Sequence, residues 1–249
     1  MSLQHALEAH GRPVVPGGSP MTSTVLTIGN AGALGEAVLA RLLASPRYRG
    51  VVAATTQHLH TSVPRLSATA FSALFDVAGW QAATGGEASR CDAVILVDGK
   101  HSFLKRDDAF PVVPLGEAIK LAQAARQAGV TRLLAVSPMD PWSGMTLGSL
   151  VHFDELERAL VSMGFETLIM VRPSEYRNPP RVSGDLLKWL ASMLLGTLGH
   201  YMTTSSRMPL RPHIVAEAAV EWLTQLPAGM HRQDAVVLHE WVRAKREGR

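Results

Sequence analysis

Three glycines, Gly29, Gly32 and Gly35, directly follow an apolar run of four residues at 25–28 and open a helix-like stretch at 33–45. The N–H groups in the first turn of a helix have no partner within the helix, and they stand at the positive end of its dipole. A strand, a glycine turn and a helix in this order therefore offer backbone N–H groups to an anion. The chemistry that this spacing predicts is the binding of a diphosphate, as in a dinucleotide.

The glycine turn has the pattern G-x-x-G-x-x-G, in which each glycine has a separate purpose. The first permits a tight turn, the second lets the backbone approach the phosphates, and the third lets the helix pack close to the strand. The expected cofactor contacts are Gly29, Asn30, Ala31, Gly32, Ala33, Leu34 and Gly35. A glycine-rich turn without any ligand is the alternative interpretation.

Two further strand ends are expected to border the adenosine half of a dinucleotide. The strand expected at 51–54 is followed by no carboxylate that could accept hydrogen bonds from a ribose 2′-hydroxyl, which slightly favours NADP over NAD. Arg65 is a cation that could reach a 2′-phosphate, and Asp98 faces the ribose or caps its loop. The expected contacts at these strand ends are Thr55, Thr56, Val97, Asp98 and Gly99.

Strands and helices are expected to alternate along the chain, and their arrangement must bring the expected contact residues together. Strands are expected at 25–28, 51–54, 93–97, 132–136, 167–171 and 235–238. Helices are expected at 33–45, 114–128, 149–163, 184–199, 212–226 and 239–247. The stretch 57–90 should hold one strand and one helix, and 70–75 fits either. Continuous apolar strands are typical of a parallel sheet covered on both faces, so the sequence predicts an α/β fold with a doubly wound parallel Rossmann-type sheet.

Composition narrows the class of protein and its environment. The 249 residues are 47% hydrophobic and 18% charged with a net charge of +3, which indicates a globular protein without a nucleic-acid partner. Cys91 is the single cysteine, which favours the cytoplasm and a packed, inert thiol. Residues 1–21 lack the features of a signal peptide and are expected to form a flexible leader, followed by one domain at 22–249.

The strongly apolar segment 185–202 is interrupted by Lys188 and His200, whereas a transmembrane helix needs ~20 nearly uninterrupted apolar residues. No transmembrane span is therefore expected. The segment could instead pack over the sheet, cover a substrate, form a homodimer or touch a membrane surface. His58 and His60 form an H-x-H pair without an evident third ligand, so no metal site is expected.

Taken in order, these features resemble the atypical short-chain dehydrogenases/reductases, of the NAD(P)-binding, NmrA-like and sugar-epimerase-like kind. Four segments carry the resemblance, which spans about 22–245: the strand and glycine turn at 25–35, the helix-to-strand passage at 125–137, the helix at 155–160 with the strand at 167–174, and the helix at 212–219. The resemblance implies a Rossmann core whose C-terminal part, 175–249, covers the substrate side.

By position, the resemblance also implies site residues. Ser137 falls where the family places its active-site serine, and Pro173 and Ser174 fall where the backbone lies near the nicotinamide. The alternative for Ser137 is a strand-end hydroxyl that satisfies the turn before Pro138.

The chain departs from the family at its catalytic pair. Family reductases use Tyr-x-x-x-Lys on the helix after the serine, where the lysine lowers the pKa of the tyrosine that donates a proton. The helix expected at 149–163 contains neither residue. His152 on that helix and Tyr176 beyond the next strand are the candidate acids in their place, with packing or surface roles as the alternative.

Two classes of function fit these observations. The first is an NAD(P)-dependent oxidoreductase that passes hydride to a small carbonyl or quinone-like molecule. The second is a non-catalytic dinucleotide sensor or scaffold that acts through a partner. The intact glycine turn supports both, and the missing Tyr/Lys pair favours the second. A degenerate fold that binds nothing is a third alternative, and the sequence leaves a homodimer or a protein partner open.

Overall fold

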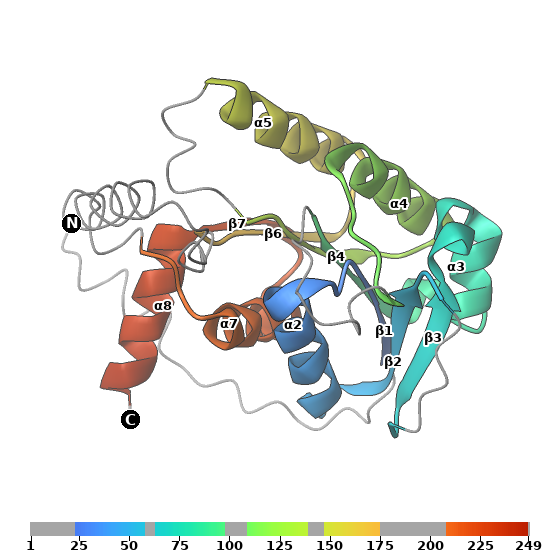
Figure 1. Cartoon of the computed structure of the whole chain (residues 1–249), viewed down its shortest axis with the longest axis horizontal. Coiled ribbons are helices and arrows are strands. Elements are labelled where there is room, and N and C mark those ends of the chain that lie inside the picture. The colour runs from blue at the N-terminus through green and yellow to red at the C-terminus, as the bar shows by residue number, and fades with distance from the viewer. Residues whose placement is uncertain (1–22, 58–62, 98–108, 139–146, 175–207, 249) are drawn as a thin grey trace, which may run out of the picture.

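A computed structural model of the protein describes residues 23–57, 63–97, 109–138, 147–174 and 208–248 (Figure 1). Strands and helices alternate along most of this length. In chain order they are β1 (Ser23–Ile28), α2 (Gly32–Ala44), β2 (Tyr48–Thr55), β3 (Leu66–Ala70), the 3₁₀ helix η1 (Phe71–Phe75), α3 (Val77–Ala83), the 3₁₀ helix η2 (Ala88–Arg90), β4 (Cys91–Leu96), α4 (Leu115–Ala128), β5 (Arg132–Val136), α5 (Leu147–Ser162), β6 (Thr167–Arg172), α7 (Pro212–Gln225), β7 (Gly229–Asp234) and α8 (Ala235–Glu247).

Within the described residues, seven strands form one sheet in the order β3-β2-β1-β4-β5-β6-β7, and every neighbouring pair is parallel. The strand order changes direction between β1 and β4, which are neighbours in the sheet but not in the sequence. Ligands of open α/β sheets bind at the carboxyl edge of such a switch point. The expected doubly wound, parallel Rossmann-type sheet is therefore confirmed.

Helices cover both faces of the sheet (Figure 1): α3, α4 and α5 lie on one face, and α2, α7 and α8 on the other. The side chains of β4 show why its sequence lacks alternation. Ala93 and Ile95 belong to the apolar cluster under the first group of helices, and Val94 and Leu96 to the cluster under the second. A strand buried on both faces needs apolar residues at every position.

The strand predicted at 235–238 is wrong, because these residues form the first turn of α8. The carboxylate of Asp234 accepts hydrogen bonds from the N–H groups of Val236 (2.9 Å) and Val237 (3.1 Å), which caps the start of the helix. The strand lies before this cap as β7, at the edge of the sheet, and its side chains are mostly exposed. An exposed edge strand needs no apolar run, so the hydrophobic pattern did not reveal it.

The stretch 57–90 contains the expected strand and helix, β3 and α3, and residues 71–75 between them form the 3₁₀ helix η1. The buried indole of Trp80 donates a hydrogen bond of 2.7 Å to the carbonyl oxygen of Leu74 and ties α3 to η1. The other predicted strands and helices are confirmed with small shifts at their ends. The leader expected at 1–21 and the helix expected at 184–199 lie outside the described residues.

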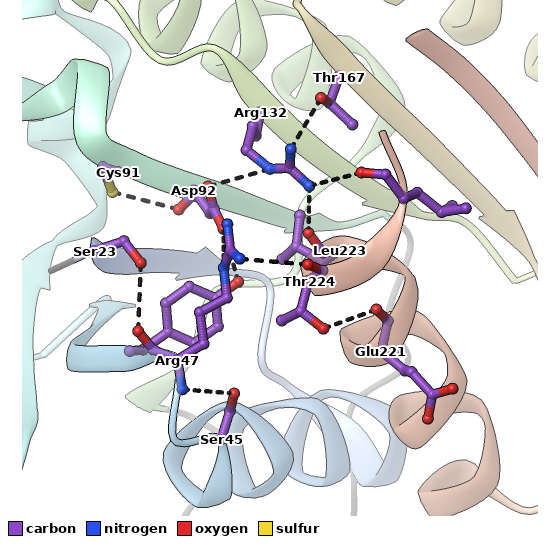
Figure 2. A network of polar contacts seen from close by, with 12 residues as sticks. Ser23, Ser45, Arg47, Cys91, Asp92, Arg132, Thr167, Glu221, Leu223 and Thr224 are labelled. Atoms are coloured by element: carbon purple, nitrogen blue, oxygen red, sulfur yellow. Dashed lines mark hydrogen bonds and ion pairs between the residues drawn. The ribbon is translucent and has the colours of Figure 1, made fainter. Parts of the chain in front are cut away.

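A polar network joins β2, β4, β5 and α7 at the amino edge of the sheet, opposite the glycine turn (Figure 2). The buried carboxylate of Asp92 accepts a hydrogen bond of 2.8 Å from the Tyr48 hydroxyl, and it lies 3.7 Å from Nε of Arg47 and 3.6 Å from Nε of Arg132. Burial raises the pKa of the Asp92 carboxyl, although both arginines and the Tyr48 hydrogen bond oppose that shift.

Guanidinium groups also cap helix ends at the amino edge. Arg132 donates to the carbonyl oxygens of Leu223 (2.6 Å) and Leu226 (3.2 Å) at the end of α7. Arg65 donates to the carbonyl oxygens of Ser45 (2.8 Å) and Tyr48 after the end of α2. The suggestion that Arg65 could reach a ribose 2′-phosphate is therefore wrong, because its guanidinium is held at the edge opposite the one where β2 ends.

Candidate functional site

The glycine turn between β1 and α2 has a backbone that demands glycine. Gly29 and Gly32 have φ angles of 84° and 78°, in the left-handed region that side chains disfavour. A Cβ atom at Gly29 would also lie 2.2 Å from the carbonyl oxygen of Leu96 at the end of β4. A Cβ atom at Gly35 would lie 2.4 Å from the carbonyl carbon of Asn30, so α2 begins tightly against the turn.

The first turn of α2 faces the switch point without an anion of its own. Ala31 stands at the cap position and makes no side-chain hydrogen bond, and the first turn of α2 contains no acidic residue. α8 shows the contrast, because Asp234 caps its N–H groups. An anion at the carboxyl edge of β1 would therefore meet the backbone N–H groups and the positive dipole end of α2.

The ends of β2 and β4 flank this turn, because β1 lies between them in the sheet. Thr55 is buried, and its hydroxyl donates to the carbonyl oxygen of Thr69 (3.3 Å). The N–H of Thr56 donates to the carbonyl oxygen of Ala109 (2.9 Å), so Ala109 lies at the end of β2. Val97 is buried beside the turn. Asp98 and Gly99 lie outside the described residues.

Ser137 lies just beyond β5 and is buried, with 4% of its surface exposed. Its N–H donates to the carbonyl oxygen of Val171 (3.0 Å), but its hydroxyl has no hydrogen-bond partner among the described residues. The alternative, in which this hydroxyl forms a hydrogen bond within the turn before Pro138, is therefore not seen in the part of the chain that the structure describes. Buried hydroxyl groups without a partner are uncommon in proteins and call for an explanation such as a ligand or a water molecule.

A buried cation lies beside Ser137. The β5–β6 register pairs Val136 with Val171, so one position further along Ser137 is the neighbour of Arg172. Arg172 is buried, and its Nη2 lies 2.7 Å from Oε2 of Glu157 on α5. The other carboxylate oxygen of Glu157 lies 3.7 Å from Nη1 of Arg232 on β7.

Sequence patterns did not reveal this ion pair, although both residues lie in segments that carried the family resemblance. The available signal was Arg172 itself. A charged residue at the end of a fully buried strand requires a counter-ion, and the helix that precedes the strand is the natural source. What the sequence could not show was which carboxylate of α5 supplies it.

Two of the remaining candidate residues lie at the same edge. Pro173 and Ser174 directly follow β6, and Pro173 is buried. His152 lies on α5, and Tyr176 lies outside the described residues. Along the carboxyl edge of the sheet, Thr55, the glycine turn, Val97 and Ser137 thus follow one another in the order β2, β1, β4 and β5.

The cysteine thiol belongs to the core and not to this edge. Cys91 opens β4, is 1% exposed, and donates from Sγ to the carbonyl oxygen of Asp92 (3.3 Å). Burial raises the pKa of this thiol to about 12. We expect no reaction of the folded protein with a chromogenic disulfide reagent at pH 8, and release of one equivalent of chromophore after unfolding in guanidinium chloride. Rapid reaction of the folded protein would contradict the packed, inert thiol.

Within the described part of the chain, neither a metal-ligand cluster nor a membrane-spanning helix is found. No three His, Cys, Asp or Glu side chains there lie close enough together to hold a metal ion. Among the same residues, no helix combines the length and the apolar character needed to cross a bilayer.

Solved structures share this architecture, although no protein-family model and no curated protein matches the chain. One is the enzyme WbmG of Bordetella bronchiseptica in complex with NAD, with a TM-score of 0.51 and 18% identity over 93% of this chain and 81% of that chain. The same enzyme in complex with NAD and UDP gives a TM-score of 0.50 and 19% identity over 88% and 74%. The fold and the glycine turn thus define a Rossmann-fold protein with the architecture of an enzyme crystallised with NAD.

Proposed function

We propose that the protein binds NAD(P) as an atypical member of the short-chain dehydrogenase/reductase type, with the diphosphate against the N–H groups that begin α2. The observation that carries this proposal is the uncapped, acid-free first turn of α2, which follows Gly29 and begins at Gly32, two glycines of positive φ at the switch point of the sheet. The NAD complexes of the similarly folded enzyme WbmG support it.

The rest of the dinucleotide would extend in both directions along the carboxyl edge. The adenosine would lie toward the end of β2, at Thr55 and Thr56, and beside Val97 at the end of β4. The nicotinamide would lie toward β5 and β6, near Ser137 and the Pro173–Ser174 backbone. NADP and NAD both remain candidates. No carboxylate follows β2 within 56–57, which favours NADP, but the cation suggested for its 2′-phosphate is held at the opposite edge.

The proposed reaction is reduction of a small carbonyl or quinone-like substrate. A reduced nicotinamide supplies a hydride when it is bound. The Ser137 hydroxyl, which has no partner in the described part of the chain, would donate a hydrogen bond to the carbonyl oxygen that receives the negative charge. The proton that completes the alcohol would come from His152 or Tyr176, the two candidate acids of the sequence.

A non-catalytic dinucleotide sensor or scaffold is the second candidate function. Helix α5 contains no tyrosine and no lysine, and it contributes Glu157 to an ion pair with Arg172 beside the position of the serine. A helix used in this way holds the fold together without lowering the pKa of any tyrosine. This function requires a partner protein or a second copy of the chain to read the bound state.

Thermal unfolding with added dinucleotide tests the proposal. At a concentration ~100 times its dissociation constant, a ligand stabilises the folded state by about 2.7 kcal/mol, which for a domain of this size raises Tm by roughly 5–10 °C. We expect such a shift with NADPH, NADH or both, measured by differential scanning fluorimetry. Tm unchanged by either dinucleotide would remove the reductase and the sensor together.

Consumption of NADPH or NADH, followed by absorbance with a panel of carbonyl and quinone compounds, then separates the two candidates. Turnover with any member of the panel supports the reductase. Binding without turnover across the panel supports the sensor.

A further inference from the structure

The second residue of the glycine turn, Asn30, points its side chain into the protein. Asn30 is fully buried, and its amide nitrogen donates to Oγ1 of Thr27 (3.0 Å) and to the carbonyl oxygen of Gly35 (3.2 Å). Thr27 lies near the end of β1, and Gly35 lies in the first turn of α2. One side chain therefore bridges the two elements that the glycine turn connects.

The direction of the Asn30 amide is fixed by these two partners. The carbonyl oxygen of Gly35 can only accept, so the NH₂ group must face it, and the Oδ1 atom is left buried without a partner among the described residues. An unpaired buried acceptor is unfavourable. The amide is held in this orientation because both of its N–H bonds are used across the turn.

The backbone of Asn30 packs against the same helical turn. The position of a Cβ atom at Gly35 lies within 2.6 Å of the Cα, carbonyl carbon and carbonyl oxygen of Asn30. Side chain and backbone of one residue thus fix the start of α2 relative to the end of β1. The residues between these contacts, 31–34, carry the N–H groups that an anion would meet.

We propose that Asn30 is a positioning residue for the dinucleotide, which holds the N–H groups of residues 31–34 in the arrangement that receives the diphosphate. This inference rests on the proposed function. A turn that is already ordered loses little conformational freedom when the ligand binds, whereas a loose turn must be ordered by the ligand and binds it more weakly. The contribution of Asn30 is therefore to affinity for the diphosphate and not to contact with it.

Three variants and two ligands test the inference by isothermal titration calorimetry and ligand-observed NMR. Asn30→Ala removes both hydrogen bonds of the bridge, and Thr27→Val removes one of them at nearly constant volume. Thr27→Ser keeps the hydroxyl and is the matched control. The ligands are the dinucleotide that the wild type binds more tightly, NADPH or NADH, and adenosine, which keeps the nucleoside but has no phosphate.

We expect Asn30→Ala to weaken dinucleotide binding by roughly tenfold, as the loss of one or two hydrogen bonds predicts, and Thr27→Val by a smaller factor. Thr27→Ser should bind as the wild type does. Adenosine affinity should be unchanged in all three variants, because only the diphosphate uses the turn. If Asn30→Ala fails to fold, the comparison of Thr27→Val with Thr27→Ser alone tests whether the bridge contributes to dinucleotide affinity.

Three results would overturn the inference. Wild-type dinucleotide affinity in every folded variant would show that the bridge does not position the turn. An equal loss for dinucleotide and adenosine would show a general loosening of the fold. A wild type that binds neither NADPH nor NADH would remove the proposed function itself, a failure visible before any variant is made.

Discussion

Replacing Gly32 with aspartate is expected to abolish NAD(P) binding while the protein stays folded. The new carboxylate would stand at the first residue of α2, where the diphosphate is proposed to lie, and would repel it. The strain of a side chain at a φ of 78° costs about 1–2 kcal/mol. A negative charge at a helix N-terminus recovers roughly 0.3–1 kcal/mol of that, since α2 has no acid of its own there. With this carboxylate at the start of α2, the turn can no longer accept the diphosphate.

Calorimetric titration of Gly32→Asp with NADPH and NADH should show a dissociation constant raised by at least about a hundredfold, equivalent to roughly 2.7 kcal/mol. Gly32→Asn is the matched control, because asparagine has nearly the same shape, tolerates a positive φ and carries no charge. It should weaken binding far less. Near wild-type affinity in Gly32→Asp would place the diphosphate elsewhere and remove the structural basis of the proposed function.

Sequence patterns predicted the sheet and its glycine turn because both leave local signatures. All six residues of β4 are buried, and the four that follow Asp92 form a continuous apolar run that stands out from its surroundings. The two positive φ angles of the turn require glycine at fixed places, and the following helix begins at the second of them. Signatures of this kind are carried by consecutive residues and need no knowledge of the fold.

The C-terminal elements were mistaken because an edge strand has no such signature. Backbone pairing with β6 makes β7 a strand, and backbone groups are the same for every sequence. Valines at 236 and 237 suggested a strand. Asp234 before them is a favoured cap residue, however, and its carboxylate stabilises the start of a helix. Local capping outweighed the strand propensity of two β-branched residues.

Contacts between distant residues account for the rest of what the sequence did not show. Glu157 meets Arg172 because α5 lies over β6, and Asn30 bridges to Gly35 because of the exact path of the turn. Arg65 was misplaced for a topological reason: it precedes β3, and residues that precede parallel strands lie at the amino edge. The cofactor contacts, Ser137 as the active-site serine, and His152 and Tyr176 as acids stay predictions, which ligand binding and turnover must decide.

The amino-edge network provides the largest expected effect on stability. Asp92→Ala should lower the free energy of unfolding by about 3 kcal/mol, measured by guanidinium chloride denaturation at pH 7. The substitution leaves the fully buried Tyr48 hydroxyl without its acceptor. It also removes the negative charge between Arg47 and Arg132, whose side chains are 39% and 22% exposed. Because these arginines are partly exposed to water, the expected loss of stability is at the lower end of the range for a broken buried ion pair. An unchanged denaturation midpoint would contradict this account of the network.

Asp92→Asn separates the charge from the hydrogen bond, since asparagine can still accept from Tyr48. It should therefore be less destabilising than Asp92→Ala.

The pKa of Asp92 is raised above its usual 3.8 because burial outweighs the Tyr48 hydrogen bond and the two arginines. Ionisation therefore costs more in the folded than in the unfolded state. The stability that a raised pKa contributes is fully present below the unfolded pKa and is lost as pH rises through the folded pKa. Wild type should accordingly gain stability relative to Asp92→Asn as pH falls from 7 toward 4; a change of the opposite sign would mean that the arginines outweigh burial.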